Sequence, residues 1–255
     1  MENNQTKEYR DKNDYEIIKE IALKSKRKDW YRMITMKLFN SWNKMNHKKV
    51  HRIMKEYNLL SIVRKRNPYK NMEKKTQVHR TFANILNRNF KWLKAYKKLW
   101  TDISYLYYNW NKAYISILKD MVSWEIVSHK VSSNLWLNFV LNTINDAKDK
   151  INLKWSIIQS DQWCHYTNPL YINLLKDNWI VQSMSRKWNC LDNAPTESFF
   201  WHMKDEIELN KVKTFWDLES HIDDYIYYYN NNRPQWTRKK MTPVDYKNNL
   251  NITKN

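Results

Sequence analysis

The chain contains no glycine, and this absence constrains its fold more than any other feature of the sequence. The chain has 255 residues. An average protein is about 7% glycine, so roughly 18 glycines are expected in a chain of this length. Glycine is the default residue wherever the backbone takes a positive φ or closely approaches another group. A fold of this size needs several such places, so either it does without them or another residue occupies them.

Tryptophan stands in several glycine contexts, and the chain has 14 tryptophans. Trp110 lies between two asparagines, where a hairpin would read Asn-Gly. Trp179 follows Lys-Asp-Asn, where a helix would end before a strand. Trp163 and Trp188 lie in polar loops. We hypothesise that the gene uses UGA for glycine and was translated with a code that reads UGA as tryptophan. A genuinely tryptophan-rich protein is the alternative.

The charge balance predicts a polyanionic partner. The chain has 45 basic and 26 acidic residues, which gives a net charge of +19. Such a basic surface most often binds nucleic acid, although an ordinary basic protein remains the alternative. Two cysteines, Cys164 and Cys190, are too few for a disulfide framework and fit a reducing cytosol. No apolar run approaches the length of a membrane span, so we expect a cytoplasmic protein without a membrane partner, associated with the nucleoid when bound to DNA.

The N-terminal quarter has the pattern of a helix-turn-helix. Residues 14–27 place apolar side chains at helical spacing, with Asp14 as a candidate N-cap. If Trp30 and Trp42 are read as glycine, the next stretch becomes a short helix, a turn and a second helix near 47–57. The polar side of that second helix is basic, as in DNA-reading helices. A small helical bundle with a solvated charged face is the alternative.

From residue 98 the pattern becomes that of an α/β domain. Short β-rich runs alternate with amphipathic stretches. The predicted strands are 98–108, 113–122, 125–133, 156–161 and 180–185. The predicted helices are 134–149, 169–178, 192–208 and 214–230.

Three acids stand out by their placement in these elements. Asp102 lies in the first strand, Asp161 ends the fourth, and Glu197 lies early in a helix, with 35 residues between it and Asp161. A lone aspartate at a strand end usually shapes a turn, and a lone glutamate in a first helical turn usually complements the helix dipole. Together, and in this order, the three acids indicate a metal site. Carboxylate oxygens suit Mg²⁺, and two such ions about 4 Å apart can drive phosphodiester chemistry.

The motifs around these acids resemble a known family. WTDISYL, SDQ-x-x-HYT and SRK-x-NCLDNAPTESFF resemble the DDE catalytic core of insertion-sequence transposases, which is related to retroviral integrases. The second reading frame of the insertion-sequence-three family is the most similar group. Residues 14–66 resemble its helix-turn-helix segment, and residues 230–246 resemble its C-terminal motif. The family has glycine where this chain has Trp163, Trp188 and Trp201, which supports the recoding hypothesis independently.

The resemblance implies a fold and a division of the chain. The expected fold is an RNase H-like α/β core, with a mixed five-stranded sheet flanked by helices, preceded by an all-α helix-turn-helix segment. The expected domains are a DNA-binding segment at 1–66, a basic linker at 67–97, the catalytic core at 98–232 and a C-terminal tail at 233–255.

The resemblance also implies an activity and its residues. The expected activity is metal-dependent 3′-end cleavage and strand transfer of an insertion sequence. The alternatives are a structure-selective nuclease on the same fold and a non-catalytic DNA-binding remnant of a decayed element. Asp102, Asp161 and Glu197 are the expected catalytic residues and ligands of two Mg²⁺ ions, with Mn²⁺ able to substitute.

Further residues are assigned to DNA binding or to accessory roles. His165 is a candidate for orienting a water or a phosphate, although an ordinary hydrogen-bonded loop histidine is equally consistent with the sequence, and Asn193 is expected to shape the entry to the Glu197 helix. The expected partners are the element ends and target DNA, a second copy of the chain in the DNA complex, and the product of the upstream reading frame. The candidate DNA contacts are Lys48, Lys49, Arg52, Arg186, Lys187, Asn189, Arg233, Lys239 and Lys240.

Overall fold

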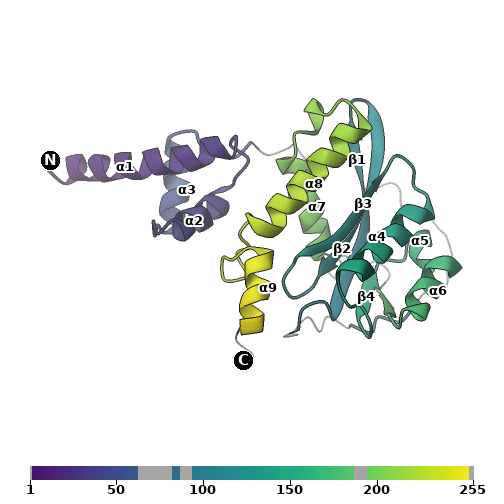
Figure 1. The fold of residues 1–255 in the computed structure, drawn as a ribbon. Helices are drawn as coiled ribbons and strands as arrows, with labels where there is room; N and C mark the ends of the chain where they lie inside the picture. Colours follow the sequence, from purple (N-terminus) through teal and green to yellow (C-terminus); the bar gives the residue numbers. More distant parts are fainter. Residues whose placement is uncertain (1, 63–81, 87–93, 187–193, 253–255) are drawn as a thin grey trace. The chain divides into compact units, whose positions relative to one another are not determined.

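The chain forms two compact units in the computed structural model (Figure 1). The first unit comprises residues 1–69 and 234–242, and the second comprises residues 70–233 and 243–255. The predicted linker falls mostly outside the described residues, and the predicted C-terminal tail is divided between the two units. The structure describes residues 2–62, 82–86, 94–186 and 194–252.

The first unit is built on three helices, as the pattern predicted. Its apolar core contains Ile18, Leu38 and Ile53, one from each helix. The side chain of Asn46 caps the third helix by accepting a hydrogen bond from the backbone N–H of Lys48 at 2.9 Å. The helices are α1 (Glu2–Lys24), α2 (Tyr31–Asn40) and α3 (His47–Glu56).

One expectation for this unit was wrong. Asp14 does not cap a helix, because α1 begins at Glu2 and Asp14 lies inside it. Its carboxylate instead forms an ion pair with Lys49 of α3. Apolar spacing alone did not reveal this early start, because residues 2–13 are almost entirely polar.

The segment 234–242 completes the first unit from far along the sequence. The ammonium group of Lys240 lies 3.7 Å from the centre of the Phe39 ring. The ring of Trp236 meets His47 edge-on, with the ring centres 6.5 Å apart. The side-chain amide of Asn40 donates to the carbonyl oxygen of Lys240 at 3.4 Å. A short C-terminal segment thus packs on the helices α2 and α3.

The second unit contains the predicted mixed five-stranded sheet, in the order β3-β2-β1-β4-β5. β1, β2 and β3 form an antiparallel meander, whereas β4 and β5 run parallel to β1. The central strand β1 is therefore flanked by one antiparallel and one parallel neighbour. The strands are β1 (Lys98–Tyr108), β2 (Asn111–Asp120), β3 (Ile126–Ser132), β4 (Ile157–Ser160) and β5 (Val181–Met184).

Helices cover both faces of this sheet (Figure 1). Residues two apart on a strand share a face, so β1 and β2 each contribute to two separate cores. Leu106 and Ile117 pack with α7 and α8, whereas Ile103 and Leu118 pack with α4 and α6. The helices are α4 (Leu137–Lys150), the short α5 (Cys164–Thr167), α6 (Pro169–Asp177), α7 (Ala194–Glu206) and α8 (Phe215–Asn231), with a 3₁₀ turn at Leu209–Lys211.

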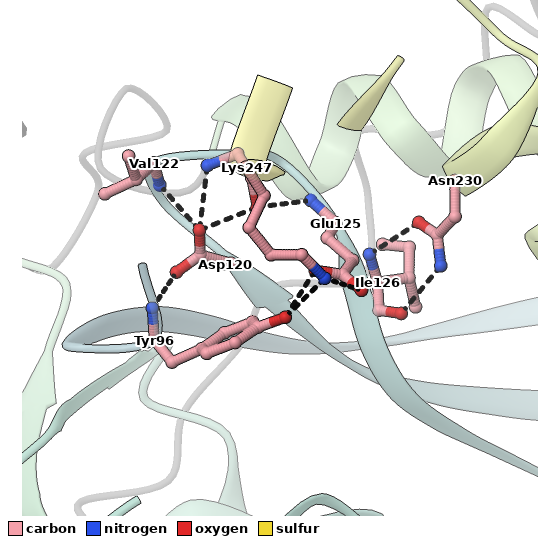
Figure 2. A network of polar contacts seen from close by, with 8 residues as sticks. Tyr96, Asp120, Val122, Glu125, Ile126, Asn230 and Lys247 are labelled. Carbon is pink, nitrogen blue, oxygen red and sulfur yellow. Dashed lines mark hydrogen bonds and ion pairs between the residues drawn. The ribbon is translucent and has the colours of Figure 1, made fainter. Parts of the chain in front are cut away.

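A last helix, α9 (Pro243–Ile252), was not predicted from the sequence. Figure 2 shows the polar network beside it. Lys247 of α9 forms an ion pair with Glu125 at 2.8 Å and donates to the Tyr96 hydroxyl at 2.8 Å, which itself donates to Glu125 at 2.7 Å. The Asp120 carboxylate accepts the backbone N–H of Val122 at 3.2 Å, in the turn after β2, and the backbone N–H of Tyr96, just before β1, at 2.7 Å, so it ties these two segments together.

Among the described residues, five tryptophans occupy the left-handed backbone region that favours glycine. Trp42, Trp110 and Trp179, which stand in predicted glycine contexts, have φ values of 64°, 64° and 57°. Trp124 and Trp155 share this conformation, with φ values of 70° and 63°. Two other predicted glycine positions differ, because Trp163 and Trp30 have ordinary φ values of −70° and −81°. No described helix combines the length and apolar character that a bilayer-spanning segment needs.

Candidate active site

The sheet register brings Asp102 and Asp161 level with each other on neighbouring strands. β1 and β4 are parallel, and Trp100 lies opposite Gln159 in this pair. Each acid lies two residues beyond its member of that pair. Neighbouring strands are about 4.8 Å apart, so two acids at matching positions lie close together at the C-terminal end of β4.

Helix α7 begins beside Asp102 and carries the third acid in its first turn. Glu197 lies in the first turn of α7, and its side chain is exposed. The preceding residue, Thr196, is fully buried and donates its hydroxyl to Oδ2 of Asp102 at 3.2 Å. The other oxygen of Asp102 accepts the backbone N–H of Ile103 at 2.8 Å. The first turn of α7 is therefore tied directly to the Asp102 carboxylate.

The charges of the other two acids act on the Asp102 carboxyl group. Burial raises the pKa of Asp102 well above its usual range, and the charge of Asp161 raises it further. Hydrogen bonds from Ile103 and Thr196 oppose this rise, and Glu197 adds a smaller increase. A buried carboxylate beside two others is unfavourable by itself, and a bound cation would offset that cost.

The donor atoms suit a hard divalent cation, although the side chains are not gathered around one. Among the described residues, no three His, Cys, Asp or Glu side chains lie close enough together to hold a metal ion as they stand. Oδ1 of Asp161 accepts the backbone N–H of Trp163 at 3.0 Å, which holds this carboxylate at the end of β4. Three carboxylates from two strands and a helix form an all-oxygen donor set, which Mg²⁺ prefers.

His165 takes the ordinary structural role that the sequence left open. Its side chain is buried, and Nε2 lies 3.0 Å from the carbonyl oxygen of Leu135. Nδ1 lies 3.5 Å from the sulfur of Cys164. Both ring nitrogens thus face protein atoms, and we do not retain His165 as an accessory catalytic residue. Asn193, the other candidate, lies outside the described residues.

The basic residues of α3 divide into two groups. Lys49 pairs with Asp14, and Arg52 pairs with Asp11 at 2.9 Å, so both side chains turn toward α1. Lys48 is exposed on α3. The three residues were predicted together as DNA contacts, but the fold gives two of them ion pairs within the unit.

Arg233 does not fit its expected role as a DNA contact. Its side chain is 3% exposed and forms an ion pair with Glu206 at 2.7 Å. Burial lowers the pKa of Arg233, but the charge and hydrogen bonds of Glu206, together with Tyr225 and Tyr229, raise it, and the net pKa is raised. The guanidinium group therefore anchors the end of α8 to α7, and we remove Arg233 from the proposed DNA contacts.

The remaining candidates fall in two places. Arg186 is exposed just after β5, in the loop that leads toward Glu197, while Lys187 and Asn189 lie outside the described residues. Lys239 is exposed in the 234–242 segment, and Lys240 is partly covered by its contact with Phe39.

Thr196 was missed by sequence reasoning. Nothing in the sequence around it shows that this threonine, next to Glu197, faces Asp102 on another element.

The fold is that of a class of protein with two parts, an integrase-type core and a helix-turn-helix unit. Two family models match in agreement with this class, an HTH-like domain at residues 8–67 and an integrase core domain at residues 197–250. A solved simian T-cell lymphotropic virus intasome, in complex with a PP2A regulatory subunit, shares the fold with a TM-score of 0.54 at 11% identity, covering 84% of this chain and 74% of that one.

Curated relatives narrow the class to a family. The Escherichia coli putative transposase InsK of insertion element IS150 is 34% identical over 91% of this chain and 81% of its own length. A Haemophilus influenzae transposase-like protein is 35% identical over 80% of this chain and 94% of its own length. The chain belongs to the insertion-sequence-three family of transposases, and it is a DNA transposase with an integrase core.

Proposed function

We propose that this transposase cleaves the 3′ ends of its insertion sequence and transfers them to target DNA, using Asp102, Asp161 and Glu197 to hold Mg²⁺. The observation that carries this proposal is the register that sets Asp102 and Asp161 level on neighbouring parallel strands, with the first turn of α7, which carries Glu197, bound to Asp102 through Thr196. The charges of Asp161 and Glu197 also raise the pKa of the buried Asp102, and a carboxyl group perturbed by specific charged partners is a physical reason to propose a functional site. Two ions, with Mn²⁺ able to substitute, would suit this donor set.

The protein supplies rigid positions for the reacting groups. When bound, divalent ions activate the attacking oxygen and stabilise the leaving oxygen of a phosphodiester. Asp102 is fixed by hydrogen bonds from Ile103 and Thr196, and Asp161 is fixed by Trp163, so two carboxylates have defined positions before DNA arrives. The exposed Glu197 is the movable member, and we propose that it turns toward the other two when the cation binds.

The same residues serve both chemical steps. Water attacks the phosphodiester in end cleavage, and the freed 3′-hydroxyl takes the place of that water in strand transfer. Arg186 lies in the loop between β5 and α7, and we propose that it contacts the phosphate of the scissile strand. Phosphate contacts of this kind position the duplex without reading its sequence.

Glu197→Gln tests the metal assignment. The variant keeps the size of the side chain and removes its charge, so strand transfer with a DNA carrying the element ends should fall by more than about 100-fold, above the loss typical of an outer-shell partner. DNA binding, measured by fluorescence anisotropy, should stay near the wild-type level. Glu219→Gln on α8 is the matched control. Equal transfer by the two variants would rule out Glu197 as a ligand, and general nicking without transfer would favour a nuclease.

We also propose that the exposed face of α3 binds the element ends. Lys48 is exposed on α3, whereas Lys49 pairs with Asp14 of α1, so Lys48→Ala should weaken DNA binding and lower the salt dependence of log K by about one unit. Lys24→Ala removes an exposed α1 lysine that pairs with Glu20, and it should leave binding unchanged. The reverse ranking of the two variants would place the DNA elsewhere.

Assembly is part of the proposal. We propose that the chain acts as a homo-oligomer on DNA, because both ends of an element must be held together during transfer, and that the product of the upstream reading frame joins this complex. Light scattering of the protein with and without end DNA measures the first point. A complex that stays monomeric on DNA would contradict it.

A further inference from the structure

Lys119 is a buried lysine near the middle of the catalytic sheet. Its side chain is 1% exposed in β2, where it lies opposite Trp100 of β1, while Ile117 lies opposite Asp102. Cross-strand partners lie on the same face of a sheet, and so do residues two apart along a strand. The side chain of Lys119 therefore leaves the sheet on the face that carries Asp102, beneath α7 and α8.

The ammonium group of Lys119 reaches the first turn of α7. Nζ donates to the carbonyl oxygen of Pro195 at 2.9 Å. It also lies 5.6 Å from the ring centres of both Phe199 and Tyr229. Trp124, one of the left-handed tryptophans, adds a third ring at 5.0 Å. A cation attracts aromatic faces, and a hydrogen bond from a charged donor is stronger than one from a neutral donor.

This contact adjoins the two residues that matter most on α7. Pro195 precedes Thr196, which binds Asp102, and Thr196 precedes Glu197. The hydrogen bond from Lys119 and the one from Thr196 thus hold consecutive residues of the same turn. Because the turn is fixed at two points, the main chain of Glu197 has a fixed position over the sheet.

We infer that Lys119 is a positioning residue that fixes the first turn of α7 so that Glu197 joins Asp102 and Asp161 at one cation. This inference rests on the proposed function, because it takes Glu197 as a ligand. The fold by itself does not require a lysine here. Burying an ammonium group costs several kcal/mol before compensation, whereas a methionine of similar length would pack among the same rings without that cost.

Lys119→Met removes the donor and the charge while keeping much of the volume. Without metal, hydrogen exchange at the backbone amides of residues 198–201 should become about tenfold faster, because loss of a charged hydrogen bond makes local opening of this turn easier. The Mg²⁺ concentration for half-maximal transfer should rise about tenfold, and the rate at saturating Mg²⁺ should recover. Lys98→Met, which removes another buried lysine of this sheet (4% exposed), is the control and should change neither quantity.

The outcomes separate this inference from the proposed function. If Lys119→Met behaves like Lys98→Met in both measurements, Lys119 does not position α7. If Lys119→Met does not fold, Lys119→Gln is measured in the same way, because it keeps a hydrogen-bond donor without the charge. Failure of both variants to fold would assign Lys119 a purely structural role and overturn the inference. Amide exchange is measured without metal, so it does not depend on Glu197 being a ligand. Full transfer by Glu197→Gln would therefore contradict the proposed function without changing the exchange result for Lys119→Met.

Discussion

At the scale of single residues, the left-handed tryptophans are the most unusual feature of this chain. An L-residue with a Cβ pays about 1–2 kcal/mol in the left-handed region, which glycine does not pay. Trp110 shows the mismatch most clearly, because it shares a two-residue hairpin turn with Asn109 (φ 38°) and its side chain is fully exposed. Asn-Gly is the preferred pair for such a turn. Glycine at position 110 in protein from the native host would therefore establish the recoding hypothesis.

Trp110→Gly should stabilise the chain. The substitution removes left-handed strain and loses no packing, so the free energy of unfolding in urea should rise by about 1 kcal/mol. Trp100→Gly is the contrasting variant, because Trp100 is 2% exposed in β1, and it should lower that free energy by about 3–5 kcal/mol. A loss of stability in Trp110→Gly would show that the indole at this turn belongs to the fold.

His202 should make stability depend on pH. Burial lowers its pKa from 6.5 to about 4, and the charges of Arg233 and Lys119 contribute. A depressed pKa means that the folded state resists protonation, so stability is intact above the unfolded value of 6.5 and is lost as the pH falls toward 4. One pKa unit corresponds to about 1.4 kcal/mol, so the full loss is roughly 3 kcal/mol.

The measurement compares urea unfolding of wild type and His202→Gln at neutral pH and near pH 4. Wild type should lose roughly 3 kcal/mol more than the variant over this range, since only wild type has the titrating ring. His221→Gln, which removes an exposed histidine of α8, should follow wild type. Parallel pH profiles for wild type and His202→Gln would show that the ring is not buried in this way.

At the scale of elements, the strands of the sheet could be predicted because their apolar residues alternate. An element that is held by contacts between distant parts of the sequence could not be predicted. All five strands were found from apolar alternation and turn residues, and the motif around Glu197 located α7. Helix α9 was missed because its sequence, PVDYKNNLNI, is rich in asparagine and weak in helix formers. Its stability comes instead from contacts such as the Lys247–Glu125 pair, whose partners lie far apart in the sequence.

Lys247→Met should loosen α9. The Lys247 and Glu125 side chains are mostly buried, and removal of the lysine leaves Glu125 with an unbalanced charge, so unfolding should cost about 2 kcal/mol less. Lys211→Met is the control, because Lys211 pairs with Glu208 at a similar distance of 2.7 Å but is exposed. This variant should change the free energy of unfolding by less than about 0.5 kcal/mol. Equal effects of the two substitutions in urea unfolding would show that the Lys247–Glu125 ion pair does not stabilise α9.

At the scale of the whole molecule, the sequence revealed the class of protein but not how the chain is divided. The order of Asp102, Asp161 and Glu197, with the motifs around them, was sufficient to predict the core. The packing of Lys240 on Phe39 was not predictable, because no local pattern links residues 201 positions apart. The same limit applies to Lys119 and Thr196, whose roles depend on which strand and helix lie against them.

The central claim is that Asp102, Asp161 and Glu197 bind a common cation, and metal-directed cleavage of the protein tests it most directly. Fe²⁺ replaces Mg²⁺, and ascorbate with peroxide then generates hydroxyl radicals at the bound ion, which cut the nearby main chain. Mass spectrometry should place the cuts around positions 102, 161 and 197, and excess Mg²⁺ or Asp102→Asn should suppress them. Cuts confined to other segments, or unchanged by both treatments, would contradict a shared metal site.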